Sequence, residues 1–139
     1  MKILVCGGSG FIGSTFIHNY LKSNSELSIT NIDNLTIGSN QENLKDIQSN
    51  NQYNFIQDNI QNESVISNLV KDFDIVVNFA AESHVDRSIS NPKPFVETNV
   101  LGTYSLLEAI RKHDKLFIHV STDEVYGDAE NGESFNEIS

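Results

Sequence analysis

Two neighbouring carboxyl side chains lie in a polar segment near the end of the chain. The segment reads STDEVY at residues 121–126 and follows the apolar run LFIHV at residues 116–120. Asp123 and Glu124 stand side by side in it, next to the hydroxyl of Thr122. Adjacent carboxyls in a dry site disfavour double ionisation, so one can donate a proton while the other accepts one. The segment is a candidate acid/base site.

A glycine-rich turn lies at the other end of the chain. After the apolar residues 3–6, the sequence reads GGSGFIG, with glycines at Gly7, Gly8, Gly10 and Gly13. These glycines satisfy both G-x-x-G-x-x-G and G-x-G-x-x-G. Side chains there would block a pyrophosphate or the close packing of a helix on a strand, and a helix N-terminus carries about half a positive charge. The turn predicts a dinucleotide site, with an ordinary strand-to-helix turn as the alternative.

Asp33 lies twenty positions after Gly13, at the end of the apolar run 27–32. Its carboxylate can accept hydrogen bonds from a ribose diol, and it would repel a 2′-phosphate. No Lys or Arg occurs at residues 34–37 to offset that repulsion. The sequence therefore favours NAD over NADP, the alternative being that Asp33 only forms a turn.

Polar and small residues also follow the third and fourth apolar runs. Asp58 and Asn59 are expected near the adenine, with turn formation as the alternative. Ala80 and Ala81 would let a flat cofactor lie against a strand end. The polar cluster at residues 82–88 then falls at the carboxyl edge, where doubly wound sheets bind ligands, or else it forms a solvated loop.

Apolar runs alternate with helix-like stretches, which is typical of an α/β fold. Several runs are apolar on both faces, as strands covered by helices on both sides must be. We expect a doubly wound parallel sheet, a Rossmann fold with strand order 3-2-1-4-5. The expected strands are residues 2–6, 27–32, 53–56, 75–79 and 116–120. The expected helices are residues 11–22, 63–71 and 94–112, with a surface helix and turn at 40–51 and a loop at 128–139.

Length and charge limit the possible functions. The 139 residues suffice for one domain but are short for an enzyme with cofactor and substrate domains. We interpret residues 1–139 as a dinucleotide-binding domain that lacks the C-terminal part of the fold. A formal charge of −10 argues against nucleic-acid binding.

The histidines, the cysteine and the hydropathy pattern argue against a metal site and a membrane span. The four histidines share no metal-ligand spacing, and Cys6 is the single cysteine, so no metal and no internal disulfide are expected. No segment resembles a signal peptide or membrane span. These features predict a cytoplasmic protein in a reduced setting.

The chain resembles the extended short-chain dehydrogenase/reductase family, and within it the nucleotide-sugar 4,6-dehydratases. The resemblance rests on residues 7–13, Asp33, residues 80–88 and residues 121–127. The motifs AESHVDRS and TDEVYG look specific to the dehydratases, whereas the glycine motif is shared across the whole family. Related epimerases and decarboxylases usually carry Ser or another small residue at the position of Asp123.

The resemblance implies that dTDP-glucose is the substrate and NAD the cofactor. NAD takes a hydride from sugar C4, water leaves across C5 and C6, and the hydride returns to C6. Glu124 matches the base at C5, Asp123 the acid at the C6 hydroxyl, and Thr122 a donor to the C4 oxygen. The carboxyl pair is expected to be buried in a dry cleft.

The resemblance also implies contacts with substrate and cofactor and pairing with a second subunit, and it shows where this chain departs from the family pattern. Ser83 and Thr122 match substrate contacts, and the helix at 94–112 matches one that pairs subunits in a homodimer. The implied cofactor contacts are Gly7, Gly10, Phe11, Ile12, Gly13, Asp33, Asn34, Leu35, Thr36, Asp58, Asn59, Phe79, Ala80, Ala81, Ser83 and Thr98. The family's Tyr-x-x-x-Lys pair is missing, so the fragment itself is expected to be inactive. A UDP-sugar epimerase or decarboxylase, and a non-catalytic NAD-binding module, remain as alternatives.

Overall fold

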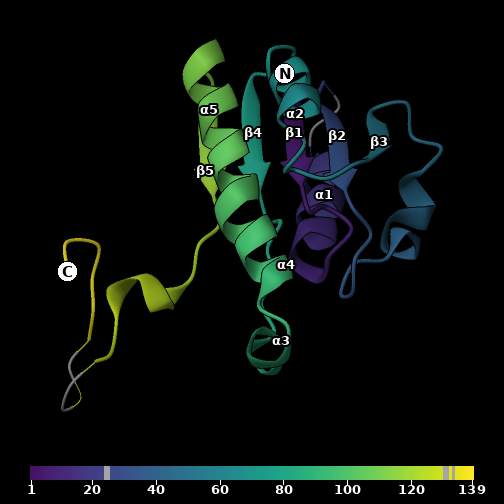
Figure 1. The fold of residues 1–139 in the computed structure, drawn as a ribbon. Helices are drawn as coiled ribbons and strands as arrows, with labels where there is room; N and C mark the ends of the chain where they lie inside the picture. Colours follow the sequence, from purple (N-terminus) through teal and green to yellow (C-terminus); the bar gives the residue numbers. More distant parts are fainter. Residues whose placement is uncertain (24–25, 130–131, 133) are drawn as a thin grey trace.

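Five parallel strands form one sheet in the order β3-β2-β1-β4-β5, as Figure 1 shows for the computed structural model. The structure describes residues 1–23, 26–129, 132 and 134–139. The strands are β1 (Lys2–Cys6), β2 (Ser28–Asp33), β3 (Tyr53–Gln57), β4 (Ile75–Asn78) and β5 (Leu116–His119). The predicted fold class and strand order are confirmed, and the strand bounds agree within one residue.

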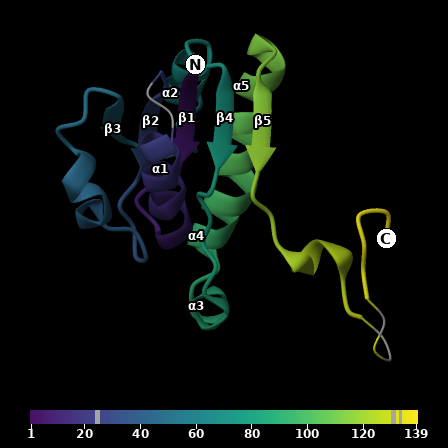
Figure 2. The ribbon, with the colours of Figure 1, turned by 180° about the vertical axis from the view of Figure 1, so that it is seen from behind.

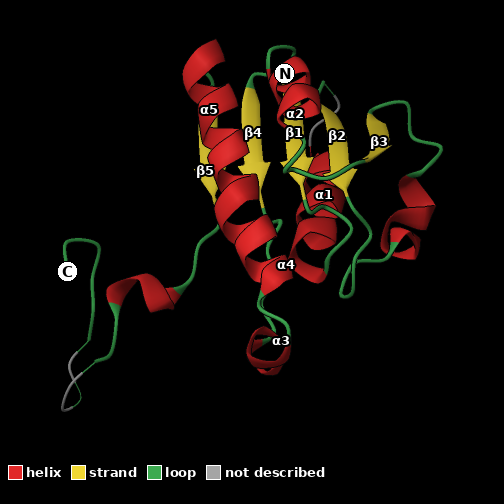
Figure 3. Ribbon diagram, in the orientation of Figure 1, coloured by secondary structure: helices red, strands yellow, loops and turns green. Residues whose placement is uncertain are grey.

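Helices cover both faces of the sheet. One face is covered by α2 (Glu63–Val70) and α5 (Thr103–His113), and the other by α1 (Phe11–Ser23) with the 3₁₀ segment η1 (Gln41–Ile47). Figure 2, turned by 180° from Figure 1, has the α1 face toward the viewer, and Figure 3 separates helices from strands by colour. No helix in the described part of the chain is long and apolar enough to cross a membrane.

The strand side chains alternate between the two covered faces. Leu4 and Cys6 of β1 belong to the core under α2 and α5, whereas Ile3 and Val5 belong to the core under α1. This double burial explains why the β1 sequence is apolar throughout rather than alternating. Burial also raises the pKa of the Cys6 thiol, which therefore stays neutral and unreactive.

The helix expected at residues 94–112 forms as one continuous helical run, in which the winding changes. The structure has α4 (Lys93–Phe95), a π-helical segment η2 (Val96–Gly102) and then α5. Gly102 sits against Ile60, because a Cβ at Gly102 would lie 2.6 Å from the Ile60 Cδ1. A short helix, α3 (Val85–Ser90), also forms within the polar cluster. The expected helix is therefore present, and only its π-helical segment was not foreseen, because apolar spacing does not separate α from π winding.

The chain leaves the body of the fold after β5. The 3₁₀ turn η3 (Asp123–Tyr126) and the last residues extend away from the sheet in both ribbon views. The described residues after Gly127 form no helix or strand, as expected for a loop, while residues 130, 131 and 133 of the expected loop lie outside the described part. β5 is an edge strand that pairs only with β4 among the described residues.

Candidate functional site

An open cavity of about 390 Å³ lies at the carboxyl edge of the sheet. It is bordered by the glycine-rich turn, by the loops that follow β2, β3 and β4, by Thr98 of η2 and by Val120 beyond β5. Cavities of this volume hold small molecules and cofactors. The carboxyl edge of a doubly wound sheet is also where such folds bind ligands, so this cavity is the candidate site.

The backbone amides of the glycine-rich turn fall into two groups. Those from Gly7 to Gly10 each have an acceptor inside the protein, at 2.9 to 3.3 Å. The acceptors are, in order, the Ile32 carbonyl, Asn31 Oδ1, Asp33 Oδ2 and the Gly7 carbonyl. The bonds of α1 begin only where Ser14 N–H donates to the Gly10 carbonyl, at 3.0 Å.

The second group consists of the backbone amides in the first turn of α1. Among the hydrogen bonds of the described residues, none satisfies the N–H groups of Phe11, Ile12 and Gly13, as is usual for a helix start. All three residues line the cavity. Unsatisfied amides and the positive end of the helix dipole together attract phosphate. The geometry therefore fits a pyrophosphate at this helix start.

The four glycines of the turn serve different purposes. Gly7 has a φ of 75°, and a Cβ there would lie 2.5 Å from the Ala80 nitrogen. A Cβ at Gly13 would lie 2.5 Å from the Gly7 carbonyl oxygen, and one at Gly8 would overlap Asn31. At Gly10 a Cβ would meet only the Gly7 carbonyl oxygen, at 3.5 Å. Three glycines thus permit internal packing, and Gly10 alone keeps open space in the cavity.

Asp33 is held at the end of β2 by two backbone amides. Its Oδ2 accepts from Ser9 N–H and its Oδ1 accepts from Leu35 N–H, both at 2.9 Å. Asp33 lines the cavity, and no Lys or Arg does so among the described lining residues. Each carboxylate oxygen has a second lone pair left for a ligand hydroxyl. The site thus presents an uncompensated carboxylate.

Leu35 does not line the cavity, contrary to expectation. It adopts a left-handed backbone conformation with φ of 54° and is half-buried. This turn points its N–H back toward Asp33. Leu35 therefore supports the site through its backbone.

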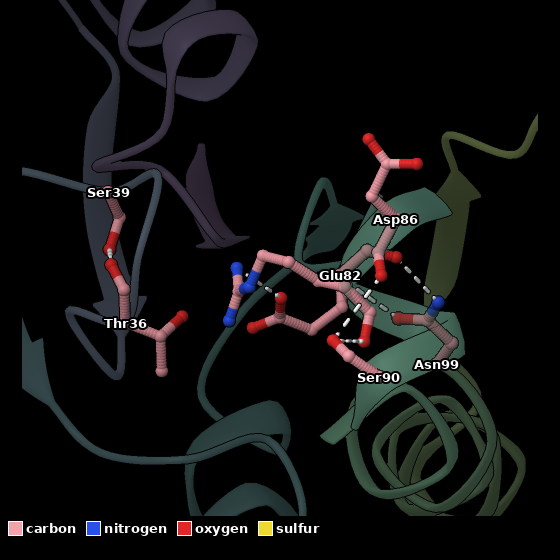
Figure 4. Close-up of polar contacts among 7 residues, drawn as sticks. Thr36, Ser39, Glu82, Asp86, Ser90 and Asn99 are labelled. Carbon is pink, nitrogen blue, oxygen red and sulfur yellow. Dashed lines mark hydrogen bonds and ion pairs between the residues drawn. The ribbon is translucent and has the colours of Figure 1, made fainter. Parts of the chain in front are cut away.

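The loop after β4 is hydrogen-bonded to η2 through Asn99. Asn99 Oδ1 accepts from Glu82 N–H at 2.8 Å, and Asn99 Nδ2 donates to the Glu82 carbonyl at 2.9 Å. The buried Glu82 carboxylate pairs with Arg87 at 3.2 Å. Figure 4 shows Asn99 beside Glu82, with Thr36 and Ser39 on the loop after β2, and both loops line the cavity. Asn99 was not singled out from the sequence, because only the fold brings it to this loop.

Asp58 and Asn59 form the predicted turn at the edge of the cavity. Both residues line the cavity. Asp58 Oδ1 accepts from Asn59 N–H at 2.7 Å, and Asn59 Oδ1 accepts from Gln61 N–H at 3.0 Å. These local bonds form the turn and leave the residues at the cavity edge.

The carboxyl pair is not buried in a cleft, which corrects the expectation from sequence. Asp123 and Glu124 are both exposed, and neither they nor Thr122 lines the cavity. Thr122 Oγ1 donates to Asp123 Oδ1 at 3.1 Å and accepts from Glu124 N–H at 3.3 Å. The physical reason is that η3 leaves an edge strand and none of the described elements covers it. Val120, two residues before Thr122, does border the cavity.

Most residues expected at the cofactor line the cavity. Leu35 is the exception among them. Glu82 and His84, which belong to the polar cluster predicted at this edge, line the cavity as well. The cavity also has lining residues that the sequence did not indicate: Ile32, Ile37, Gly38, Ser39, Ile60 and Val120. They lie beside predicted residues in the same loops, so extending each motif by two or three positions would have found them.

The fold and cavity define a Rossmann-type domain. A protein-family profile described as GDP-mannose 4,6 dehydratase matches residues 4–138. The chain belongs to this family of nucleotide-sugar dehydratases.

Individual relatives agree with that family. A dTDP-glucose 4,6-dehydratase of Mycobacterium tuberculosis is 45% identical over 130 residues, covering 94% of this chain and 39% of the relative. A dTDP-glucose 4,6-dehydratase of Bacillus anthracis, solved in complex with NAD, matches with a TM-score of 0.86 and 42% identity over 99% of this chain and 42% of that chain. A UDP-glucuronic acid 4-epimerase of Bacillus cereus, in complex with UDP-glucuronic acid and NAD, matches with a TM-score of 0.85 and 38% identity, covering 96% of this chain and 44% of that chain. The chain spans about two fifths of the length of these proteins.

Proposed function

We propose that the cavity binds NAD. The open amides of Phe11, Ile12 and Gly13 suit the pyrophosphate, and the Asp33 carboxylate suits a ribose diol. Phe11 and Ile12 are 83% and 59% exposed, which is unusual for large apolar side chains and is explained if a ligand covers them. The solved relatives from B. anthracis and B. cereus are both complexes with NAD.

The replacement Asp33→Asn is expected to relax the preference for NAD over NADP. The carboxylate repels a 2′-phosphate, and an amide of the same shape does not. We expect the ratio of the NADP and NAD dissociation constants to fall about tenfold, corresponding to about 1.4 kcal/mol. Titration of both cofactors against the wild type and the variant measures this ratio. An unchanged ratio would show that Asp33 does not face the ribose.

We propose further that the whole protein is a nucleotide-sugar 4,6-dehydratase acting on dTDP-glucose. The observation that carries this proposal is the Asp123-Glu124 pair, which follows a strand whose next residue, Val120, borders the cavity. A dehydratase needs a base and an acid at neighbouring carbons, and a simple epimerase does not need this pair. The related M. tuberculosis protein is a dTDP-glucose 4,6-dehydratase.

The proposed roles follow from the order of the chemistry. A bound nicotinamide dinucleotide supplies the means to oxidise sugar C4 and later to reduce C6. Glu124 removes the C5 proton once C4 is a ketone, because the carbanion then delocalises into the carbonyl. Asp123 protonates the departing C6 hydroxyl, and Thr122 donates a hydrogen bond to the C4 oxygen. Ser83, at the cavity wall, contacts both cofactor and sugar.

We also propose that the whole protein contains further segments that pack against β5. Leu116 and Ile118 of β5 and Val120 just after it are 59%, 48% and 42% exposed, and they form a large apolar edge. We infer that additional strands and a substrate domain cover this edge and enclose η3, which would bury the carboxyl pair. The domain described by residues 1–139 is then the dinucleotide-binding part. The lone, buried Cys6 is compatible with a reduced, cytoplasmic setting.

The dehydratase proposal is tested by an activity assay of the whole protein. Incubation with dTDP-glucose should yield the 4-keto-6-deoxy sugar, detected by mass spectrometry as the loss of one water. UDP- and GDP-sugars are assayed in parallel to determine which nucleobase of the sugar nucleotide the protein accepts. No turnover with any of these substrates, despite bound NAD, would contradict the dehydratase and leave a non-catalytic cofactor-binding module.

A second candidate is a nucleotide-sugar epimerase. It is favoured by the B. cereus epimerase, whose fold matches almost as well as that of the B. anthracis dehydratase. Epimerisation returns the C4 hydroxyl with inverted configuration and releases no water. The same assay therefore distinguishes the two reactions.

We also propose that the whole protein forms a homodimer through η2 and α5. Val96, Val100, Tyr104 and Leu107 are all about half exposed on these consecutive helical segments. An apolar stripe of this kind is typical of helices that pair across an interface.

The variant Val100→Glu is expected to convert this dimer to a monomer, because it places a charge in the apolar stripe. Light scattering coupled to size-exclusion chromatography measures the mass. The partly exposed Lys115→Glu serves as the control, since Lys115 lies outside the stripe and follows α5. A dimer that persists in Val100→Glu would place the interface elsewhere.

A further inference from the structure

We propose that Asn31 is a positioning residue that shapes the glycine-rich turn for the phosphates of the dinucleotide. The inference rests on the proposed function, since it assigns a role toward the same ligand. Asn31 lies behind the turn and does not line the cavity. It would therefore act on the ligand only through the backbone of the turn.

Asn31 occupies a position where an apolar side chain is expected. It lies near the end of β2 and is fully buried, on the sheet face that Ile29 shares with α1. Burying an amide costs free energy unless its polar atoms are hydrogen-bonded. A polar residue here therefore needs a local reason.

The hydrogen bonds of Asn31 supply that reason. Its Oδ1 accepts from Gly8 N–H at 2.9 Å, while its Nδ2 donates to Ser9 Oγ at 3.1 Å and to the Tyr53 hydroxyl at 3.2 Å. The Gly8 N–H can only donate, which fixes the orientation of the amide. Two of the three partners thus belong to the glycine-rich turn.

Packing and hydrogen bonding act on the same two turn residues. The Asn31 side chain lies so close under Gly8 that a Cβ at Gly8 would overlap it. The next amide, Ser9 N–H, is bound by Asp33 Oδ2 at 2.9 Å. Side chains two residues apart on β2 therefore hold consecutive amides of the turn. This turns Gly8 and Ser9 inward and leaves the amides of Phe11, Ile12 and Gly13 to the cavity.

Tyr53 provides a matched control, because it contacts the same amide nitrogen as Ser9. Its hydroxyl contacts Asn31 Nδ2 but makes no recorded bond to the turn. Burial raises the pKa of this hydroxyl, so it stays protonated at neutral pH. Tyr53→Phe removes one bond of Asn31 and leaves those to Gly8 and Ser9 intact.

The test compares NAD affinity with fold stability in the whole protein. In Asn31→Ala, the Gly8 N–H loses its acceptor and a gap opens under the turn, so we expect the NAD dissociation constant to rise about tenfold or more. Tyr53→Phe should change it by less than about twofold, even if both variants lose similar thermal stability. Amide hydrogen exchange without ligand should accelerate at Gly8 and Ser9 in Asn31→Ala only.

A milder variant keeps the test decisive if Asn31→Ala does not fold. Ser9→Ala removes the hydroxyl that Asn31 contacts and should weaken NAD binding about threefold, again more than Tyr53→Phe does. Equal affinities for the turn variants and Tyr53→Phe would overturn the inference. A wild-type protein that binds no NAD would instead overturn the proposed function itself.

Discussion

Replacing either carboxyl of the Asp123-Glu124 pair is expected to slow dehydration by the whole protein strongly while leaving oxidation at C4 in place. Asn in place of Asp123 cannot supply an acidic proton to the departing hydroxyl, and Gln in place of Glu124 cannot accept the C5 proton. General acid and base groups each contribute about 10²- to 10⁴-fold to a rate, so we expect kcat to fall by at least about a hundredfold. Product formation is measured by mass spectrometry, and C4 oxidation by the absorbance change of the cofactor.

Both replacements preserve side-chain shape, and both positions are exposed in the described domain. Loss of folding is therefore not expected, and NAD affinity should stay unchanged. Asp128→Asn provides the control, because Asp128 is exposed, carries the same charge and follows η3. Dehydration at the wild-type rate in Asp123→Asn or Glu124→Gln would remove the pair from the chemistry.

Gly10→Ala is expected to weaken NAD binding strongly without destabilising the fold. The added methyl would contact only the Gly7 carbonyl oxygen, at an ordinary 3.5 Å, so the free energy of unfolding should change by less than about 0.5 kcal/mol. The same methyl would enter the cavity beside the open amides of α1, where the pyrophosphate is proposed. We expect the dissociation constant for NAD to rise about tenfold or more. Calorimetric titration and thermal unfolding measure the two quantities.

Gly13→Ala provides the comparison. Its methyl would lie 2.5 Å from the Gly7 carbonyl oxygen and 2.7 Å from the Gly8 Cα, both backbone atoms. Stability should therefore fall together with affinity, by roughly 1–3 kcal/mol for an overpacked site. If Gly10→Ala binds NAD as tightly as the wild type, the phosphates do not approach Gly10.

The fold could be predicted because each of its signals is local and repeated. Runs such as Ile75-Val76-Val77 are apolar on both faces, and the turn after β1 marks the first strand-to-helix crossing. The cavity wall followed from the same logic, since strand ends in a parallel sheet meet at one edge. Asp33, Asp58 and Ala80 could be placed there from sequence alone.

The remaining features depend on contacts between distant segments. The π-helical winding of η2 accompanies the packing of Gly102 on Ile60, which no periodicity reveals. The distinct roles of the four turn glycines depend on what lies above each of them, including Ala80 and Asn31. The exposure of Asp123 and Glu124 is a property of the edge strand β5, and a motif does not show what covers it.

We propose that the whole protein carries out an internal oxidation, dehydration and reduction of a nucleotide sugar. The most direct test gives the whole protein dTDP-glucose carrying deuterium at C4, mixed with unlabelled substrate. We expect a 4-keto-6-deoxy product in which the deuterium of each labelled molecule has moved to its own C6. A product that keeps its C6 hydroxyl with C4 inverted, or one whose C6 carries no deuterium, would contradict this proposal.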